Sequence, residues 1–529
     1  MKKVIDDIVG EVFKVSPLVL IDVRSGRLCD GPERSRVFKS DLQFELLSSK
    51  TQELDVRRIQ RVAEEYFQYV TLSHVWNGKE PLFQDVHQVG SVWKLASSSQ
   101  NEKLRKFCEV VDREGYRWAW CDTCCIDKTI STVLNQSLKM MYRWYEASTA
   151  TFVHLADVAS PSALGELTDS KWMTRAWTSQ ELLAPQVIRF YTRDWQPYLG
   201  DNRPNHKESP QIMQELADAI KIARETIISF NPDDLSVREK LRLASRRKAT
   251  VPEDVAYSLI GIFRSDIRPD YGEGDAALGH LLEEIVARSG EVTVLSWTGK
   301  SSSYNSCLPA TLRVYSKSSR TLSAIKDTQM DARVTELKGQ PSQTVVLPFH
   351  QRVVSLPPAR FDHRRLHLPC IIFGVKRLGI QDLGHGQEYC YRARVSGIGD
   401  VEFQTSDRLS LTEPRKLIFV HPWIRDLCDP SDGFIWGSEA DYDDDASDSR
   451  SEGEGTSPLH AVPAPIMDNY TRALRLVVRL QQPFHALLLQ HQPNGEFKRV
   501  AAEHNIVIPG IEHQIDFTKD VRTGVVEIL

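Results

Sequence analysis

The run from Trp172 to Glu181, WMTRAWTSQE, holds the most informative pair of side chains in this 529-residue chain. Trp177 and Glu181 are four residues apart, so a helix places them on one face. Two leucines follow, and we therefore expect the carboxylate at the edge of a core rather than in free water. A carboxylate beside an indole can stabilise an oxocarbenium-like cation or accept hydrogen bonds from ribose hydroxyls. The alternative is a structural ion pair of Glu181 with Arg175 or Arg193.

Further polar and aromatic residues follow two predicted strands, residues 69–74 and 117–121. In a parallel sheet, ligands bind outside the carboxyl ends of the strands, at the point where strand order reverses. We therefore expect these side chains to line one binding site with Glu181, Trp177 and Arg175. The candidates are Ser73, His74, Trp76, Asp122, Cys125 and Asp127. The alternatives are a helix-cap or turn role for the aspartates and a structural role for the histidine.

Three cysteines lie within the segment CDTCC at residues 121–125. Cys121 and Cys124 have a C-x-x-C spacing, but no second cysteine pair or histidine pair nearby completes the usual zinc set. A thioredoxin-like motif at a helix start is compatible with the spacing, and so is a Cys125–His74 nucleophile pair. We favour the interpretation that the three cysteines act as small apolar residues packed at the end of a strand. We therefore expect that the protein requires no metal.

The elements that position these residues follow from the pattern of apolar residues. Short apolar runs alternate with helical stripes from about residue 69 to 195, which predicts a mostly parallel sheet flanked by helices. The expected strands are 69–74, 117–121, 151–155 and 187–191, and the expected helices are 102–114, 134–145 and 172–183. We assign residues 1–200 to this α/β domain. Residues 201–296 form a helical extension, with helices at 212–228, 237–244, 253–263 and 276–287.

Residues 297–529 show short β-type runs, which predicts an all-β, sandwich-like C-terminal domain. The expected strands include 344–347, 370–373, 389–395, 417–420, 474–480, 486–489 and 524–529. Residues 439–458 interrupt them with eight acidic residues against one basic residue, and this composition predicts a disordered loop. The formal net charge of −5 comes from this loop, and the rest of the chain is slightly basic.

Composition excludes several classes of protein. With 41% hydrophobic and 26% charged residues, the chain is an ordinary globular one. No apolar run reaches the roughly 18 residues of a membrane span, and acidic residues at positions 6 and 7 disfavour a signal peptide. A near-neutral charge argues against nucleic-acid binding. We therefore expect a cytoplasmic protein.

Three sequence blocks resemble fungal heterokaryon-incompatibility (HET) domains. They are YVTLSHVW at 69–76, WAWCDTCCIDK at 118–128 followed by MMYRWYEA, and WMTRAWTSQELLAP at 172–185. The stretch 243–263 is similar to the region after many such domains. His74, Val75, Asn77 and Lys128 depart from the family's usual residues. The β-rich part carries no motif of a named family.

The resemblance implies a role in fungal self/non-self recognition and programmed cell death. HET domains are regarded as remote relatives of TIR domains, whose sheet is flavodoxin-like and whose catalytic members cleave NAD⁺ with a glutamate four residues after a tryptophan. By this analogy Glu181 is the catalytic residue, Trp177 lines the pocket, no cofactor is needed and NAD⁺ is the substrate. Because cytosol contains NAD⁺, activity needs a gate, and self-association into a homo-oligomer is the expected one.

Two alternatives stay open at this point. The first is a non-catalytic signalling module that triggers death by oligomerisation, with the β-rich domain binding an unknown protein partner. The second is a cysteine hydrolase using Cys124 or Cys125. The motifs of P-loop, Gly-rich dinucleotide-binding, His-Glu-x-x-His and Gly-x-Ser-x-Gly enzymes are missing from the sequence.

Overall fold

The computed structural model describes residues 2–49, 55–316, 325–338, 343–383, 388–423, 468–511 and 520–529. The chain divides into two units, Met1–Leu281 and Leu282–Leu529. The predicted acidic loop, 439–458, lies outside the described residues. Among the described helices, none is both long enough and apolar enough to cross a membrane.

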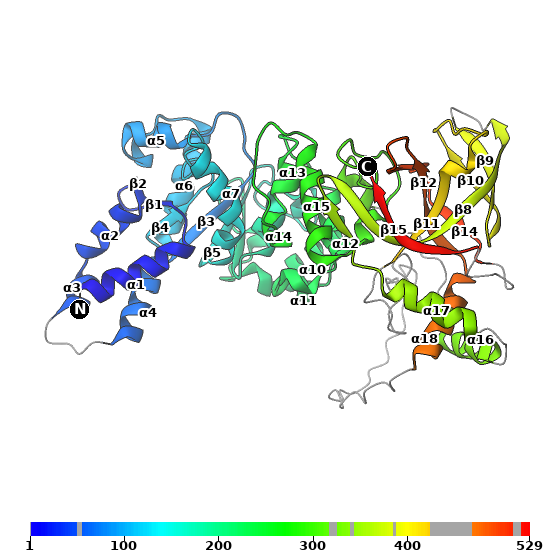
Figure 1. Ribbon diagram of the computed structural model, residues 1–529. Coiled ribbons are helices and arrows are strands. Elements are labelled where there is room, and N and C mark those ends of the chain that lie inside the picture. The colour runs from blue at the N-terminus through cyan, green and yellow to red at the C-terminus, as the bar shows by residue number, and fades with distance from the viewer. Residues whose placement is uncertain are drawn as a thin grey trace, which may run out of the picture. The chain divides into compact units, whose positions relative to one another are not determined.

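A six-stranded sheet forms the centre of the first unit, in the order β2-β1-β4-β3-β5-β6 (Figure 1). Its strands are β1 (Val19–Asp22), β2 (Arg27–Asp30), β3 (Tyr69–His74), β4 (Trp118–Trp120), β5 (Ala150–Leu155) and β6 (Ile188–Thr192). The four strands β4-β3-β5-β6 are parallel to one another. The sheet is thus mostly parallel, as predicted. Sequence reasoning missed β1 and β2, an antiparallel hairpin that extends the β4 edge.

Helices cover both faces of this sheet. On one face, Trp120 of β4 packs against Trp144 and Tyr145 of α7. On the other, Phe107 of α6 packs edge-on against Phe152 of β5. The helices before residue 200 are α1 (Lys2–Val15), α2 (Gly31–Lys39), α3 (Leu42–Ser48), α4 (Val56–Tyr66), α5 (Phe83–Val89), α6 (Ser99–Arg113), α7 (Ser131–Glu146), α8 (Glu166–Asp169) and α9 (Thr178–Leu183). The face of the sheet toward which a strand residue points therefore decides which helix it meets.

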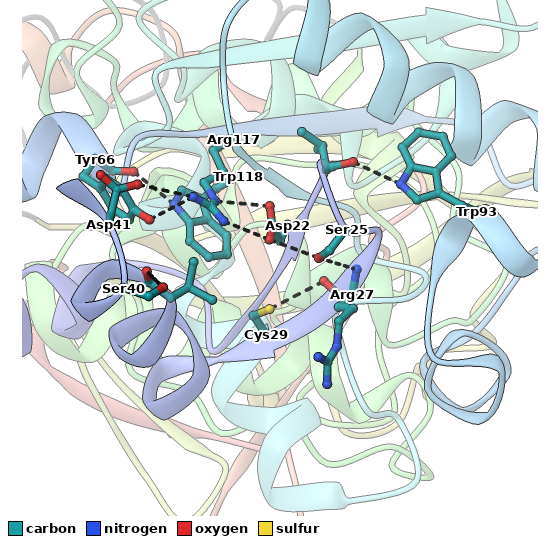
Figure 2. Close-up of polar contacts among 12 residues, drawn as sticks. Asp22, Ser25, Arg27, Cys29, Ser40, Asp41, Tyr66, Trp93, Arg117 and Trp118 are labelled. Atoms are coloured by element: carbon teal, nitrogen blue, oxygen red, sulfur yellow. Dashed lines mark hydrogen bonds and ion pairs between the residues drawn. The ribbon is translucent and has the colours of Figure 1, made fainter. Parts of the chain in front are cut away.

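The ends of the parallel strands opposite the candidate site are fastened by a polar cluster (Figure 2). Arg117, directly before β4, reaches both carboxylate oxygens of Asp22 at 3.2 Å each. Its guanidinium also donates to the Tyr66 hydroxyl at 3.0 Å and lies 3.7 Å from Asp41. Trp93 donates to the backbone oxygen of Val23 at 3.1 Å. These contacts fix the β1–β2 hairpin to the sheet.

The predicted helix 172–183 is wrong in its extent. Lys171–Thr174 is a 3₁₀ turn, Arg175 is extended at φ −82° and ψ 142°, and α9 begins only at Thr178. Backbone bonds with Lys248 interrupt the helix, since Ala176 donates to its oxygen at 2.9 Å and its nitrogen donates to Thr174 at 2.6 Å. Pairing with a segment about 75 residues away is invisible to a local pattern.

The segment after residue 200 is helical, as predicted; the helices expected at 237–244 and 276–287 are confirmed, and the other two are divided into shorter pieces. Its helices are α10 (Pro210–Ile220), α11 (Arg224–Ile228), α12 (Val237–Ser245), α13 (Asp254–Tyr257), α14 (Ile260–Phe263) and α15 (Ala276–Ser289). The expected helix 212–228 ends early because Lys221 adopts a left-handed conformation at φ 56°. In place of the expected helix 253–263 there are two one-turn helices, α13 and α14. Gly261 of α14 has no side chain, which allows this helix to lie close to Tyr142 of α7.

The second unit is β-rich, with a nine-stranded mixed sheet. Its strands are β7 (Arg360–Asp362), β8 (Arg365–Leu383), β9 (Tyr389–Val395), β10 (Gly399–Thr405), β11 (Leu417–Pro422), β12 (Phe484–His491), β13 (Phe497–Val500), β14 (Ile506–Ile508) and β15 (Arg522–Ile528). Pairing runs through β8, β11, β12, β13 and β15 and returns to β8, so these five strands form a ring. Three helices, α16 (Asp327–Lys338), α17 (Gln343–Val354) and α18 (Asn469–Leu480), share a hydrophobic core with the sheet.

Two of the predicted strands in this unit are helices. The run 344–347 lies in α17, and 474–480 lies in α18. The N-cap of α18 is Asp468, whose carboxylate accepts from the Thr471 backbone at 2.7 Å. Leu474, Val477 and Leu480 are buried at three-residue spacing, and a short apolar run of this kind fits both periods.

Candidate functional site

The candidate residues meet where β3 and β4 end. β3 supplies Ser73 and His74 as consecutive residues, and consecutive side chains of a strand point to opposite faces. Ser73 faces the α7 and α9 side and contacts Glu181. His74 faces the α6 side and contacts Glu80, which is paired with Lys103 of α6. The residues predicted as one site are therefore divided between two faces.

Glu181 is held by a chain of two hydrogen bonds. The Trp172 indole donates to the Ser73 hydroxyl at 2.7 Å, and that hydroxyl donates to the Glu181 carboxyl. An indole N–H can only donate, so the serine oxygen accepts from the tryptophan and turns its own proton to the glutamate. Both residues that hold Glu181 are buried. The carboxyl group is thus fixed at the end of β3, beside the point where strand order reverses.

The environment of Glu181 favours the neutral carboxyl group. The residue is 8% exposed, and burial raises its pKa from 4.5 to about 8. The Ser73 hydrogen bond lowers this pKa, the charge of Asp122 raises it, and Arg247 and Arg175 lower it. A pKa this far from the usual range is typical of functional carboxyl groups. A cationic ligand would shift the balance toward the carboxylate.

Arg247 is a buried guanidinium that supports the α9 start. It donates to the Thr178 hydroxyl at 2.7 Å and to the Arg175 backbone oxygen at 3.1 Å. Burial lowers the pKa of Arg247 to about 10, and the charge of Glu181 raises it. The group is therefore still charged at neutral pH, close enough to influence Glu181.

Trp177 and Arg175 are directed toward the helical segment that follows. The Trp177 side chain hydrogen-bonds to Asp254 of α13, and Arg175 donates to Thr250 at 2.8 Å. The alternative ion pair of Glu181 is not formed among the described residues, because Arg193 donates to the Ala156 oxygen at 3.0 Å instead. Arg175 acts on Glu181 only as a charge at longer range.

Trp76 and Asp122 form a second group at the rim. The Trp76 indole, 44% exposed, donates to Asp122 at 2.9 Å. The Lys128 ammonium lies 3.7 Å from the centroid of the same indole, a cation–π contact. These interactions hold a large aromatic surface in the solvent, as a site for stacking requires.

Asp127 and Cys125 belong to the loop between β4 and α7. Asp127 accepts from the Thr129 backbone at 3.0 Å and from Gln84 at 2.7 Å, and the Thr129 and Gln84 hydrogen bonds lower its pKa despite some burial. This is the turn role left open by the sequence. Cys125 is buried and accepts from the Cys121 backbone at 3.4 Å.

The buried cysteines are poor nucleophiles. Burial raises the pKa of Cys121 well above its usual value, and Cys124 is buried beside it with a pKa that is also raised. The thiolate is the reactive form of cysteine. The geometry therefore argues against a cysteine hydrolase at Cys124.

Four residues that the sequence did not single out contribute to the site. Trp172 and Lys128 lie in the quoted motif blocks, so their positions carried a signal. Arg247 lies in the stretch 243–263 that resembles the region after HET domains, whereas Glu80 lies in none of the quoted stretches. Arg247 contacts Thr178, and Glu80 contacts His74.

Part of this sequence is similar to known proteins. Residues 69–165 match the model of the heterokaryon incompatibility protein (HET) family. The chain is 33% identical over 228 residues to the vegetative incompatibility protein HET-E-1 of Podospora anserina; the match covers 41% of this chain and 16% of that protein. No solved structure matches. The matched segment includes Ser73, His74 and Asp122, whereas Glu181 lies beyond it. Residues 69–165, which include β3, β4 and β5, are thus the part of this chain that is similar to the heterokaryon-incompatibility family.

Proposed function

We propose that this domain hydrolyses NAD⁺ at Glu181 and serves vegetative incompatibility through the resulting loss of the dinucleotide and cell death. The observation that carries the proposal is the buried Glu181 carboxyl group, fixed by Ser73 at the carboxyl end of β3. The order β4-β3-β5-β6 is that of a flavodoxin-like sheet, in which ligands bind where β3 and β5 diverge. The role in incompatibility is extended from the relative, the vegetative incompatibility protein HET-E-1.

In this reaction the bond between the ribose C1′ and the nicotinamide nitrogen breaks, and its electron pair leaves with nicotinamide. Water adds to C1′ and releases a proton, which yields ADP-ribose. Glu181 in its carboxylate form accepts hydrogen bonds from the ribose hydroxyls and stabilises the oxocarbenium-like state. The positive charge of bound nicotinamide offsets the burial that keeps Glu181 neutral in the free protein.

The described conformation is a closed one for this purpose. With 8% of Glu181 exposed, a dinucleotide cannot reach the carboxyl group until covering side chains move. A closed resting state suits an enzyme whose substrate is abundant. We propose that self-association of the domain stabilises the open form, which is a shift between two populations.

The same burial favours a second candidate function. A carboxyl group held by Ser73 and influenced by Arg247 is also a sound structural element. In that case the domain is a non-catalytic signalling module, and death results from oligomerisation alone. The two functions differ in whether nicotinamide is released.

The test is nicotinamide release from NAD⁺ by the purified full-length chain at high protein concentration. We expect release by the wild type and a loss of about 10²-fold or more in Glu181→Gln, which keeps the shape but removes the charge. The matched control is Glu146→Gln, an exposed residue of α7, which should release nicotinamide at the wild-type rate. Intact NAD⁺ with the wild type, or equal rates for Glu181→Gln, would leave the signalling module as the function.

A further inference from the structure

Three potential metal ligands converge where β3 and β4 end. His74 ends β3, and Cys121 and Asp122 directly follow β4. One ligand atom from each lies within 4.8 Å of the other two. Ligands in contact with one zinc ion lie about 3.5 Å apart, given bonds of about 2.0 to 2.3 Å. Small side-chain adjustments therefore suffice to close the group around an ion.

The imidazole of His74 provides an independent observation. Its side chain is 1% exposed, and neither of its ring nitrogens has a hydrogen-bond partner among the described residues. A buried polar atom without a partner is costly, so it points to a missing ligand. Nε2 lies 3.3 Å from a Glu80 oxygen, and the tautomer with a proton on Nε2 leaves the Nδ1 lone pair for a metal.

Glu80 completes the arrangement expected behind a metal-binding histidine. A carboxylate that receives the second ring N–H of such a histidine fixes its orientation and raises its basicity. Glu80 is buried and lies between the His74 ring and the Lys103 ammonium, contacting both. Its carboxylate therefore lies where such a positioning group is needed.

We propose that His74, Cys121 and Asp122 bind one zinc-class divalent cation, with Glu80 as the positioning residue. Thiolate and imidazole ligands select zinc over magnesium or calcium. Binding replaces the Cys121 thiol proton, which leaves to solvent, and the thiolate and the Asp122 carboxylate then balance the two positive charges. Asp122 accepts from Trp76 through Oδ2, which leaves Oδ1 for the ion.

The sequence pattern did not predict this site, because its ligands come from the ends of two different strands. No motif with zinc spacing is needed when β3 and β4 bring the residues together. The ion would join the loops after these strands. Lys128, near Asp122, is the charged group with which the cation competes.

Cobalt(II) titration of the full-length chain, reduced and freed of metal by a chelator, tests the proposal. Cobalt replaces zinc and gives a sulfur-to-cobalt charge-transfer absorption only when a thiolate is a ligand. We expect this absorption to saturate at one equivalent of cobalt per chain and to disappear when zinc is added. Cys121→Ser should lack it, while Cys108→Ser, a buried cysteine of α6 near Cys121, should retain it.

Two further variants keep the result decisive if Cys121→Ser fails to fold. Asp122→Asn and Glu80→Gln should keep the absorption and bind cobalt about 10- to 100-fold more weakly. No charge-transfer absorption in the wild type, or unchanged affinity in Asp122→Asn, would overturn the site. The readout involves no NAD⁺, so its failure is separate from failure of the proposed hydrolase.

Discussion

Glu181 combines three properties at the scale of one residue: a fixed position, a short polar chain to Trp172 and a raised pKa. The sequence identified Glu181 and Ser73 as neighbours of one site, although 108 residues separate them. That success rests on a rule about strand ends, which any parallel sheet obeys. The same rule placed His74 in the site, because it does not say which face a side chain takes. Ser73 and His74 are consecutive residues of β3 and therefore point to opposite faces of the sheet, so only Ser73 reaches Glu181.

The raised pKa of Glu181 makes stability depend on pH. In the unfolded chain the group ionises near its usual pKa of 4.5, and in the folded chain near 8. Its contribution to stability is complete below pH 4.5 and is lost as pH rises through 8. We expect the free energy of unfolding of the wild type to fall relative to Glu181→Gln between about pH 5 and pH 9, by at most about 5 kcal/mol.

Urea unfolding of both proteins at several pH values measures this difference. Glu146→Gln serves as the control, since Glu146 is exposed on α7, and its curve should run parallel to that of the wild type. A difference between wild type and Glu181→Gln that is constant over this range would contradict a raised pKa.

At the scale of elements, two strongly patterned elements were predicted correctly, one helix failed through a distant contact, and one run failed through a neighbouring cap that its apolar pattern did not show. The buried run of β3 and the apolar stripe of α6 stood as predicted. The helix at 172–183 broke because Lys248 pairs with its backbone, and the stretch 474–480 became α18 because Asp468 caps it. The start of α9 determines the position of Trp177. It could not be predicted from the sequence, because it depends on the backbone pairing with Lys248.

Gly261 shows how closely the helical segment packs on the sheet domain. A Cβ at Gly261 would lie 2.1 Å from the Cβ of Tyr142 in α7, too close for any pair of carbon atoms. We expect Gly261→Ala to destabilise the protein by about 1 to 3 kcal/mol, since α14 and α7 must separate. Thermal unfolding measures the loss.

Gly10→Ala is the matched control for this substitution. Gly10 lies in α1, and no atom of another described element comes within 4 Å of the place that an added Cβ would take. Alanine favours a helix over glycine by roughly 0.5 to 1 kcal/mol, so this variant should be as stable as the wild type or more so. Equal behaviour of the two variants would refute a close α7–α14 contact.

At the scale of the whole molecule, closure of Glu181 and the proposed self-association belong together. In the proposed scheme, a closed monomer and an open assembly would form two populations, and the concentration of the chain would set their ratio. Neither the trigger nor the geometry of assembly follows from residue patterns, because both depend on surfaces rather than on a core.

Nicotinamide release per chain should therefore rise with protein concentration. We expect the specific rate to increase about tenfold or more between dilute and concentrated protein, and light scattering to report larger particles over the same range. A specific rate that stays constant while the particles grow would separate catalysis from assembly. Glu181→Gln should assemble like the wild type without releasing nicotinamide.

The backbone pairing of Thr174 and Ala176 with Lys248 bears on how this domain can be moved between proteins. The family match ends at residue 165, yet Arg247, Lys248 and Thr250 hold the segment that carries Glu181. A graft ending at the family boundary would leave that segment behind, and one ending at residue 200 would remove its support. A transplantable piece of this protein therefore has to include Arg247, Lys248 and Thr250 as well as the matched segment.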